Sequence, residues 1–159
     1  MTPYKLFWAA FLSLTPISEL RGGIPYAVAN GMPLLSAALW CLAWNALAGP
    51  IAYVFLQTVH KLLYRWGWYA SFFDRFVERA RAKVKPSVDK YGYWGLAIFV
   101  GIPLPLTGAW TGALGAWILG MERKKSMLAV AAGVLMAAVI VTLVVGLGVG
   151  ALSFLLKRV

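Results

Sequence analysis

Residues 14–25 read LTPISELRGGIP and interrupt an apolar N-terminal region with two prolines, a glycine pair and two opposite charges, Glu19 and Arg21. No Asp, Glu, Lys or Arg occurs in residues 6–18 or in residues 22–59, so the two charges are isolated between segments of membrane-like composition. An ionisable side chain in hydrocarbon costs about 2.5–3.5 kcal/mol and usually faces a protein interior or a watery cavity. We therefore expect the working site here. The alternative is an extramembrane loop in which both side chains are hydrated.

The composition indicates an integral membrane protein. Hydrophobic residues make up 62% of the 159 residues and charged residues 13%, and the mean hydropathy is +0.77. The net charge of +10 comes from basic residues between apolar segments, which favours contact with anionic lipid headgroups at the cytoplasmic face over binding to nucleic acid. We expect one multi-pass domain over residues 1–159 in the cell inner membrane or plasma membrane, and a homodimer is left open.

Nothing in the sequence indicates an enzyme or a cofactor. The chain has no Ser/His/acid set and no glycine-rich loop followed by a lysine of the kind that cradles phosphates. Its single cysteine, Cys41, lies in an apolar run, so there is no paired-cysteine metal motif and we expect a buried thiol. No metal site and no cofactor are therefore expected.

The first repeat is expected over residues 1–66. Residues 4–14 form a helix of roughly 16 Å at most, about half the hydrocarbon thickness, so they cannot span alone. Pro16 breaks the chain after them, and Pro25 suits the first position of a second short helix over residues 26–32. The two short helices predict a hairpin that enters and leaves the membrane by one face. Residues 34–64 then predict a tilted span.

Gly49 and Pro50 are expected to kink this span. Asn45 lies one turn earlier, where it would either line the same interior or make a hydrogen bond to a neighbouring helix. Both interpretations of Asn45 stay open.

Residues 67–92 change character and join the two repeats. Apolar side chains recur at helical spacing while basic and acidic ones occupy other positions, so we expect an amphipathic interfacial helix that Pro86 ends. Its aromatic residues would lie at the acyl boundary and its basic residues at the headgroups. The alternative is a helix that packs on a soluble partner.

The second repeat, residues 93–159, echoes the first. A short apolar segment leads into a loop with Pro103 and Pro105, a second apolar segment follows, and residues 126–156 contain no ionised side chain. Paired interrupted segments are typical of transporters built from inverted repeats with the site at their interface. The fold class expected is all-α, with two inverted repeats that each combine a re-entrant helical hairpin and a long transmembrane helix.

Charge counting leaves the topology open. Re-entrant hairpins and fully crossing broken spans both put the same excess of basic residues inside, because Lys5, Lys157 and Arg158 exchange sides with the corner at residues 123–125. Several adjacent breakers in each loop favour the re-entrant form.

The loops are expected to bind an anion. The second helix of each hairpin starts near the membrane midplane, one after Gly22 and Gly23 and the other after Thr107 and Gly108, with the Thr107 hydroxyl as an N-cap. Free N–H groups at helix N-termini favour anions, and Arg21 adds a planar fork for phosphate or carboxylate. Glu19 is then the expected proton carrier, because burial raises a carboxyl pKa while a neighbouring cation lowers it. The alternative is a fixed ion pair between Glu19 and Arg21.

At ELRGGIP, residues 19–25, and PLPLTGAWTG, residues 103–112, the chain resembles the bacterial small multidrug export protein family over nearly its whole length. That family looks like a distant relative of the DedA superfamily, whose members carry two facing re-entrant loops and are implicated in proton-linked handling of polyprenyl phosphate lipids. Those relatives place Arg and acidic residues in both loops, whereas residues 101–108 carry none.

The resemblance implies a small proton-coupled transporter of an anionic amphiphile such as a polyprenyl (undecaprenyl) phosphate lipid carrier. Its substrate would meet Arg21, Asn45 and the loop amides, and Glu19 would carry the proton. Two other functions stay open. One is export of cationic drugs, with Glu19 as the partner of the cation. The other is a non-transporting membrane assembly or lipid-organising protein.

Overall fold

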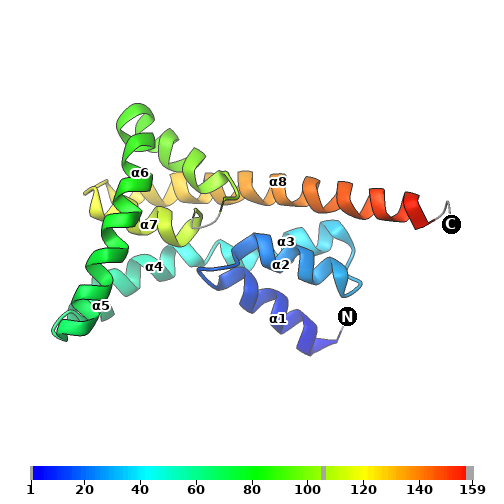
Figure 1. Ribbon diagram of the computed structural model, residues 1–159, viewed down its shortest axis with the longest axis horizontal. Coiled ribbons are helices and arrows are strands. Elements are labelled where there is room, and N and C mark those ends of the chain that lie inside the picture. The colour runs from blue at the N-terminus through cyan, green and yellow to red at the C-terminus, as the bar shows by residue number, and fades with distance from the viewer. Residues whose placement is uncertain (1, 105–106, 157–159) are drawn as a thin grey trace.

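The computed structural model describes residues 2–104 and 107–156, and over these residues it is all-helical. The predicted all-α class is confirmed for this part of the chain. The helices run in the order α1 Pro3–Leu14, α2 Glu19–Ala29, α3 Leu34–Asn45, α4 Ala48–Gln57, α5 Val59–Leu63, α6 Gly67–Gly101, α7 Ala109–Ile118 and α8 Arg123–Leu156 (Figure 1).

Among the described residues, two segments are long and apolar enough to cross a membrane. They are Leu34–Gln57, with 24 residues, and Arg123–Gly150, with 28 residues. The first is interrupted at residues 46–47, between α3 and α4, and not at Gly49 and Pro50 as the sequence predicted. Pro50 is the third residue of α4, in a first turn whose N–H groups have no partner within the helix, so its missing N–H costs little there.

Helices α1 and α2 form a hairpin. In Figure 1, α1 runs from the N-terminus toward the middle of the molecule and α2 runs back beside it. Gly23 allows this close packing, because a Cβ there would lie 1.9 Å from the Ser13 Oγ on α1. The helix begins at Glu19, so Pro25 lies inside α2 and is not its first residue. The prediction of a helix start at Pro25 was wrong, because the two glycines before it are helical.

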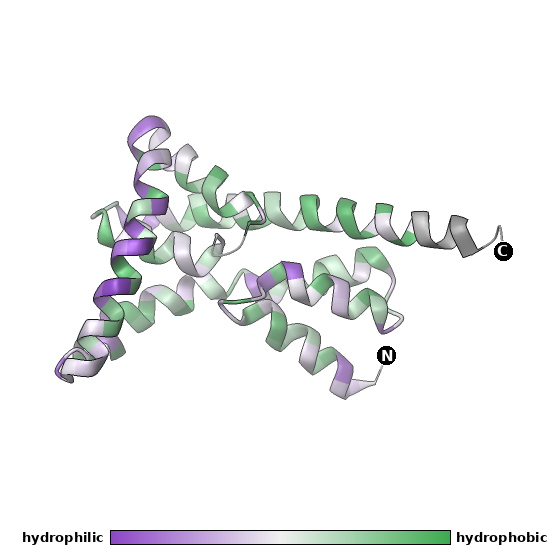
Figure 2. Ribbon diagram, in the orientation of Figure 1, coloured by the Kyte–Doolittle hydropathy of each residue, from purple (hydrophilic) through white to green (hydrophobic). Residues whose placement is uncertain are grey.

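Helix α6 passes through Pro86 and bends at Gly92. The predicted helix over residues 67–92 is present, but Pro86 does not end it. The break falls at Gly92, whose φ of 58° and ψ of −130° suit a residue without a Cβ. Figure 2 shows hydrophilic residues along the first part of α6, which lies across the direction of α8, while the part after Gly92 packs along α8.

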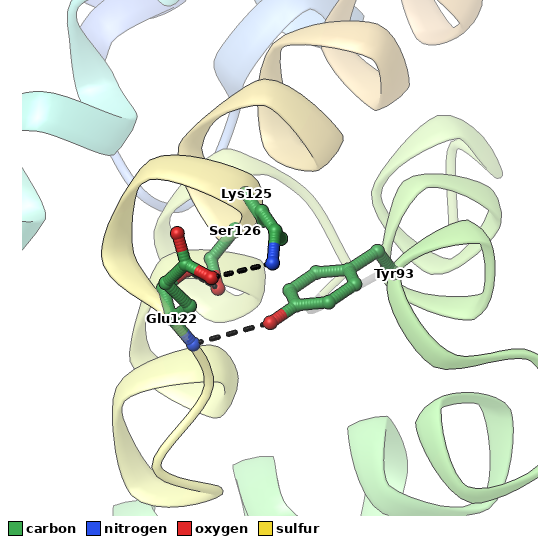
Figure 3. Close-up of polar contacts among 4 residues, drawn as sticks. All are labelled: Tyr93, Glu122, Lys125 and Ser126. Carbon is green, nitrogen blue, oxygen red and sulfur yellow. Dashed lines mark hydrogen bonds and ion pairs between the residues drawn. The ribbon is translucent and has the colours of Figure 1, made fainter.

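The corner between α7 and α8 is held by polar contacts. The Glu122 N–H donates to the Tyr93 hydroxyl at 3.3 Å, the Glu122 carboxylate pairs with Lys125 at 2.6 Å, and the Ser126 hydroxyl donates to the Glu122 carbonyl at 2.9 Å (Figure 3). The start of α8 is therefore tied to the last part of α6.

Helices from the two halves of the chain pack against each other. Helix α2 of the first half packs on α8 of the second, and α7 of the second half packs on α4 of the first. A small residue permits close approach here, since a Cβ at Gly49 on α4 would lie 3.2 Å from the Val130 Cγ1 on α8. The last part of α6 and α7 form a second hairpin. As a result, its tip and the tip of the α1–α2 hairpin come together in the middle of the molecule (Figure 1).

Candidate functional site

Glu19 lies at the tip of the first hairpin and reaches the second. Its side chain is buried, with an exposed fraction of 7% for the residue, and Oε2 accepts the Ala109 N–H at 3.3 Å while Oε1 accepts the Trp110 N–H at 3.4 Å. These are long hydrogen bonds, and they put a carboxylate at the N-terminus of α7. Glu19 also has a φ of 48°, a left-handed conformation that costs an L-residue about 1–2 kcal/mol. The chain therefore adopts an unfavourable backbone to hold this contact.

Gly108 makes room for the carboxylate. It precedes α7 with a φ of 143°, and a Cβ there would lie 2.0 Å from the Glu19 Oε2. No other residue type fits both the backbone and the space. Glu19 thus takes the role at the N-terminus of α7 that a capping side chain usually fills.

Thr107 is not the N-cap that the sequence predicted. Its hydroxyl lies 2.6 Å from the Ile102 carbonyl oxygen and 2.7 Å from that of Leu104, and it accepts the Leu104 N–H at 3.0 Å. The hydroxyl therefore closes the second loop on itself. The prediction failed because the turn before Thr107 competes with α7 for its hydroxyl.

Arg21 also binds the second loop. Its guanidinium donates to the Leu104 carbonyl and, at 3.2 Å, to the Thr107 carbonyl. In the described part of the chain Arg21 forms no ion pair with Glu19. The start of α2 thus supplies an anion to the amides at the N-terminus of α7 and a cation to the carbonyls of the second loop. Residues 101–108 themselves carry no charge.

Asn45 joins the site from α3. Its residue is 1% exposed, and its Nδ2 donates to the Ser13 carbonyl at 2.7 Å, which ties α3 to the end of α1. Its Oδ1 is buried and has no hydrogen-bond partner. A buried acceptor without a donor is costly, so Asn45 is suited to receive a proton donor that the site acquires.

These groups enclose a small cavity. Its volume is about 10 Å³, which is room for roughly one water molecule. The apolar side of the cavity comes from α2, α6 and α8, and the polar side and loop residues are Glu19, Arg21, Asn45, Pro103, Thr107 and Gly108. No substrate fits in this volume, so the structure shows the site closed.

Glu19 lies outside the two helices long enough to cross a membrane. Burial raises the pKa of its carboxyl from 4.5 to about 7, against the opposing effects of the Trp110 and Ala109 amides, the Arg21 charge and the Asn45 side chain. A carboxyl pKa that burial shifts toward neutral is a feature often found at functional sites.

The other predicted site residues are spread around this centre. Gly22 and Gly23 lie within α2 and do not line the cavity; the Gly22 N–H donates to the Ser18 carbonyl at 3.1 Å. Pro16 lines a separate apolar cavity next to the site. Pro105 falls outside the described residues.

Trp110 is a site residue that the sequence did not predict. Besides its backbone contact with Glu19, its indole N–H donates to the Leu14 carbonyl at 2.8 Å and so fastens the first loop to α7. The signal was available in principle, since a tryptophan inside an apolar segment needs an acceptor for its N–H.

The chain was compared with known proteins. The model of a protein family described as "Putative small multi-drug export protein" matches residues 19–140, which include the second loop and all the residues that line the polar side of the cavity. No curated protein and no solved structure matches the chain.

Proposed function

Since the chain belongs to the small multi-drug export protein family, we propose that it is a membrane transporter in which protonation of Glu19 opens an anion site at the N-terminus of α7. The family description and the two long apolar helices together indicate an export protein of the membrane. The proton, the substrate and the route belong to our proposal.

One observation carries the proposal. The carboxylate of Glu19 occupies the Ala109 and Trp110 N–H groups, which is where the end of a helix most favours an anion. A substrate anion could use the same amides only after Glu19 has lost its charge or moved away. Substrate and carboxylate therefore compete for one site, and this competition couples the anion to a proton.

The neighbouring groups fit such an exchange. A protonated Glu19 carries an O–H, and the buried Oδ1 of Asn45 in the same cavity has no donor. Arg21 holds only backbone carbonyls, so its fork could turn to a phosphate or carboxylate without breaking an ion pair. Binding of the anion would then be stronger at low pH, and one proton would travel with it.

We further propose that both hairpins are re-entrant and related as inverted repeats, residues 1–66 and residues 93–159. Two features support this. The hairpins point toward the middle from opposite ends of the molecule, and the cross-contacts α2 with α8 and α7 with α4 pair equivalent elements (Figure 1). With α8 along the membrane normal, the first part of α6 would lie in the plane of the interface.

The substrate class that the geometry favours is an anionic amphiphile, such as a polyprenyl (undecaprenyl) phosphate. The family description favours a second candidate, a cationic drug that would pair with Glu19. In that case the cation would have to draw the carboxylate away from two amides and bind close to Arg21. The arrangement is better suited to an anion.

A thermal-shift titration of the purified protein tests the proposal. Undecaprenyl phosphate should stabilise the wild type more at about pH 5.5 than at about pH 8, and tetraphenylphosphonium should have little effect. Arg21→Ala should weaken lipid binding at both pH values by roughly tenfold or more, because a hydrogen bond to a charged group contributes about 1.5–3 kcal/mol. Arg21→Lys keeps the positive charge but removes the planar guanidinium. It therefore shows whether lipid binding needs the guanidinium geometry or only the charge.

Glu19→Gln should bind the lipid at both pH values, because it is neutral at both. If instead the cation stabilises the wild type and the lipid phosphate does not, the drug-export function replaces ours.

A further inference from the structure

A second hollow lies between α6 and α7, away from the Glu19 cavity. It is a groove of about 330 Å³ lined by Phe76, Arg79, Ala80, Ala82, Lys83 and Thr111. Arg79 and Lys83 are four residues apart on α6 and therefore share one face of that helix. The groove thus combines two cations with apolar walls.

The described part of the chain offers the polar groups of the groove no partner. In the described part of the chain, Arg79 and Lys83 form no ion pair and the Thr111 hydroxyl makes no hydrogen bond. Arg79 and Lys83 are exposed, whereas the Thr111 residue has an exposed fraction of 8%. Two unpaired cations beside an unpaired hydroxyl are the groups that a phosphate would engage.

A separate apolar cavity lies beside the groove. Phe76 lines both the groove and a cavity of about 150 Å³ whose wall includes Pro16, Phe55, Phe73 and Trp110. Trp110 is the residue whose backbone N–H binds Glu19. The apolar cavity therefore has one lining residue in common with the basic groove, Phe76, and another, Trp110, that contacts Glu19.

We propose that the α6–α7 groove is a docking site for the phosphate headgroup of a membrane amphiphile, with the apolar cavity beside Phe76 receiving the first part of its tail. The charges of Arg79 and Lys83 complement a phosphate, and the apolar cavity explains why the ligand is a lipid and not free phosphate. This inference rests on the proposed function only for the step after docking, in which the amphiphile moves on to the Glu19 site.

The test measures binding of dioleoylphosphatidic acid to the full-length protein in neutral detergent at about pH 8, where the proposed Glu19 site is closed. Arg79→Gln combined with Lys83→Gln should weaken binding by roughly tenfold. The matched control is Arg81→Gln with Lys90→Gln, which removes the same two residue types from α6 outside the groove, and it should change binding less than about twofold. Thr111→Val, which keeps the shape, should weaken binding a few-fold.

Three results would overturn the docking site. The two double variants could weaken binding equally, which would mean diffuse attraction to α6. Dioleoylphosphatidylcholine could bind as well as phosphatidic acid, which would show that the phosphate headgroup is not recognised. Inorganic phosphate could compete at a concentration similar to that of the lipid, which would show that the tail does not contribute.

The Glu19→Gln protein separates this inference from the proposed function. In the Glu19→Gln background, Arg79→Gln with Lys83→Gln should remove the same amount of phosphatidic acid binding as it does in the wild type, whatever the effect of Glu19→Gln on pH dependence. If the groove variants lose binding and Glu19→Gln keeps the wild-type pH profile, the docking site stands and the proton-coupling proposal fails. If the groove variants bind normally while Glu19→Gln loses its pH dependence, the reverse holds.

Discussion

At the scale of single residues, the contact between Glu19 and Gly108 joins the two halves of the chain. The carboxylate fits against α7 because position 108 has no Cβ, and the left-handed backbone at Glu19 aims the side chain there. Backbone strain of this kind persists where the surrounding structure fixes it, and it is concentrated at functional sites. The closed site therefore depends on one glycine as much as on the acid.

Gly108→Ala tests this dependence. We expect it to lower the free energy of unfolding by more than about 2 kcal/mol, because the new Cβ meets both an unfavourable φ and the Glu19 carboxylate. Gly120→Ala is the control, since Gly120 also has a positive φ, 65°, but has open space around it. Denaturation of the purified proteins measures both, and equal losses would show that the contact with Glu19 adds nothing.

The sequence could single out Glu19 and Arg21 because charges in an apolar region are costly. It could not identify their partners, which are backbone amides and carbonyls more than 80 residues away in the chain. Almost every residue has the same backbone N–H and C=O groups, so the sequence does not show which of them bind Glu19 or Arg21. The folded chain is needed to show that Glu19, and not Thr107, caps α7.

At the scale of helices, Pro16 and Pro103 lie between helices as predicted, but three other prolines lie in helices where the sequence predicted a helix start, a kink or a helix end. Pro25 and Pro86 lie inside α2 and α6, and Pro50 lies in the first turn of α4. A proline inside a helix costs about 3 kcal/mol, and tertiary packing can outweigh that cost. Helical spacing predicted the amphipathic part of α6 correctly, while the position of its bend depended on Gly92, which no periodicity marks.

Gly92→Ala is expected to destabilise the protein by about 1–3 kcal/mol, because the bend of α6 needs a positive φ there. Gly67→Ala should cost little, since Gly67 begins the helix and has open space around it. A melting curve in detergent compares the two variants. Loss of stability in Gly67→Ala as large as in Gly92→Ala would mean that the bend is not set by Gly92.

At the scale of the whole molecule, the relation between the halves is the feature that the sequence showed least. Two interrupted segments with similar spacing suggested a repeat, but the charge count was equal for the two topologies. The structure brings the tip of the α1–α2 hairpin and the loop between α6 and α7 together from opposite ends of the molecule (Figure 1), and our proposal of re-entrant hairpins rests on this arrangement. The long-range packing of α2 on α8 and of α7 on α4 could not be read from composition or periodicity.

Single cysteines in a Cys41→Ser background distinguish the topologies. Re-entrant hairpins predict that Thr2→Cys and Ala29→Cys, at the two ends of the first hairpin, react with an impermeant maleimide from the same side of the membrane. Lys124→Cys should react only from the opposite, cytoplasmic side. Labelling of the first two positions from different sides would show that the hairpin crosses the membrane.

The central claim is that an anion and the ionised Glu19 carboxylate exclude one another at α7. The measurement that tests it most directly is proton uptake when undecaprenyl phosphate binds to the purified protein in weakly buffered solution. Because the pKa of Glu19 is about 7, the carboxyl is ionised at about pH 8, and the bound lipid should force it to take up about one proton. Glu19→Gln, which has no proton to gain, provides the baseline for any change in the phosphate itself. Our account predicts uptake approaching about one proton per bound lipid in the wild type above that baseline. Equal proton uptake in both proteins, with the lipid bound to each, would contradict it.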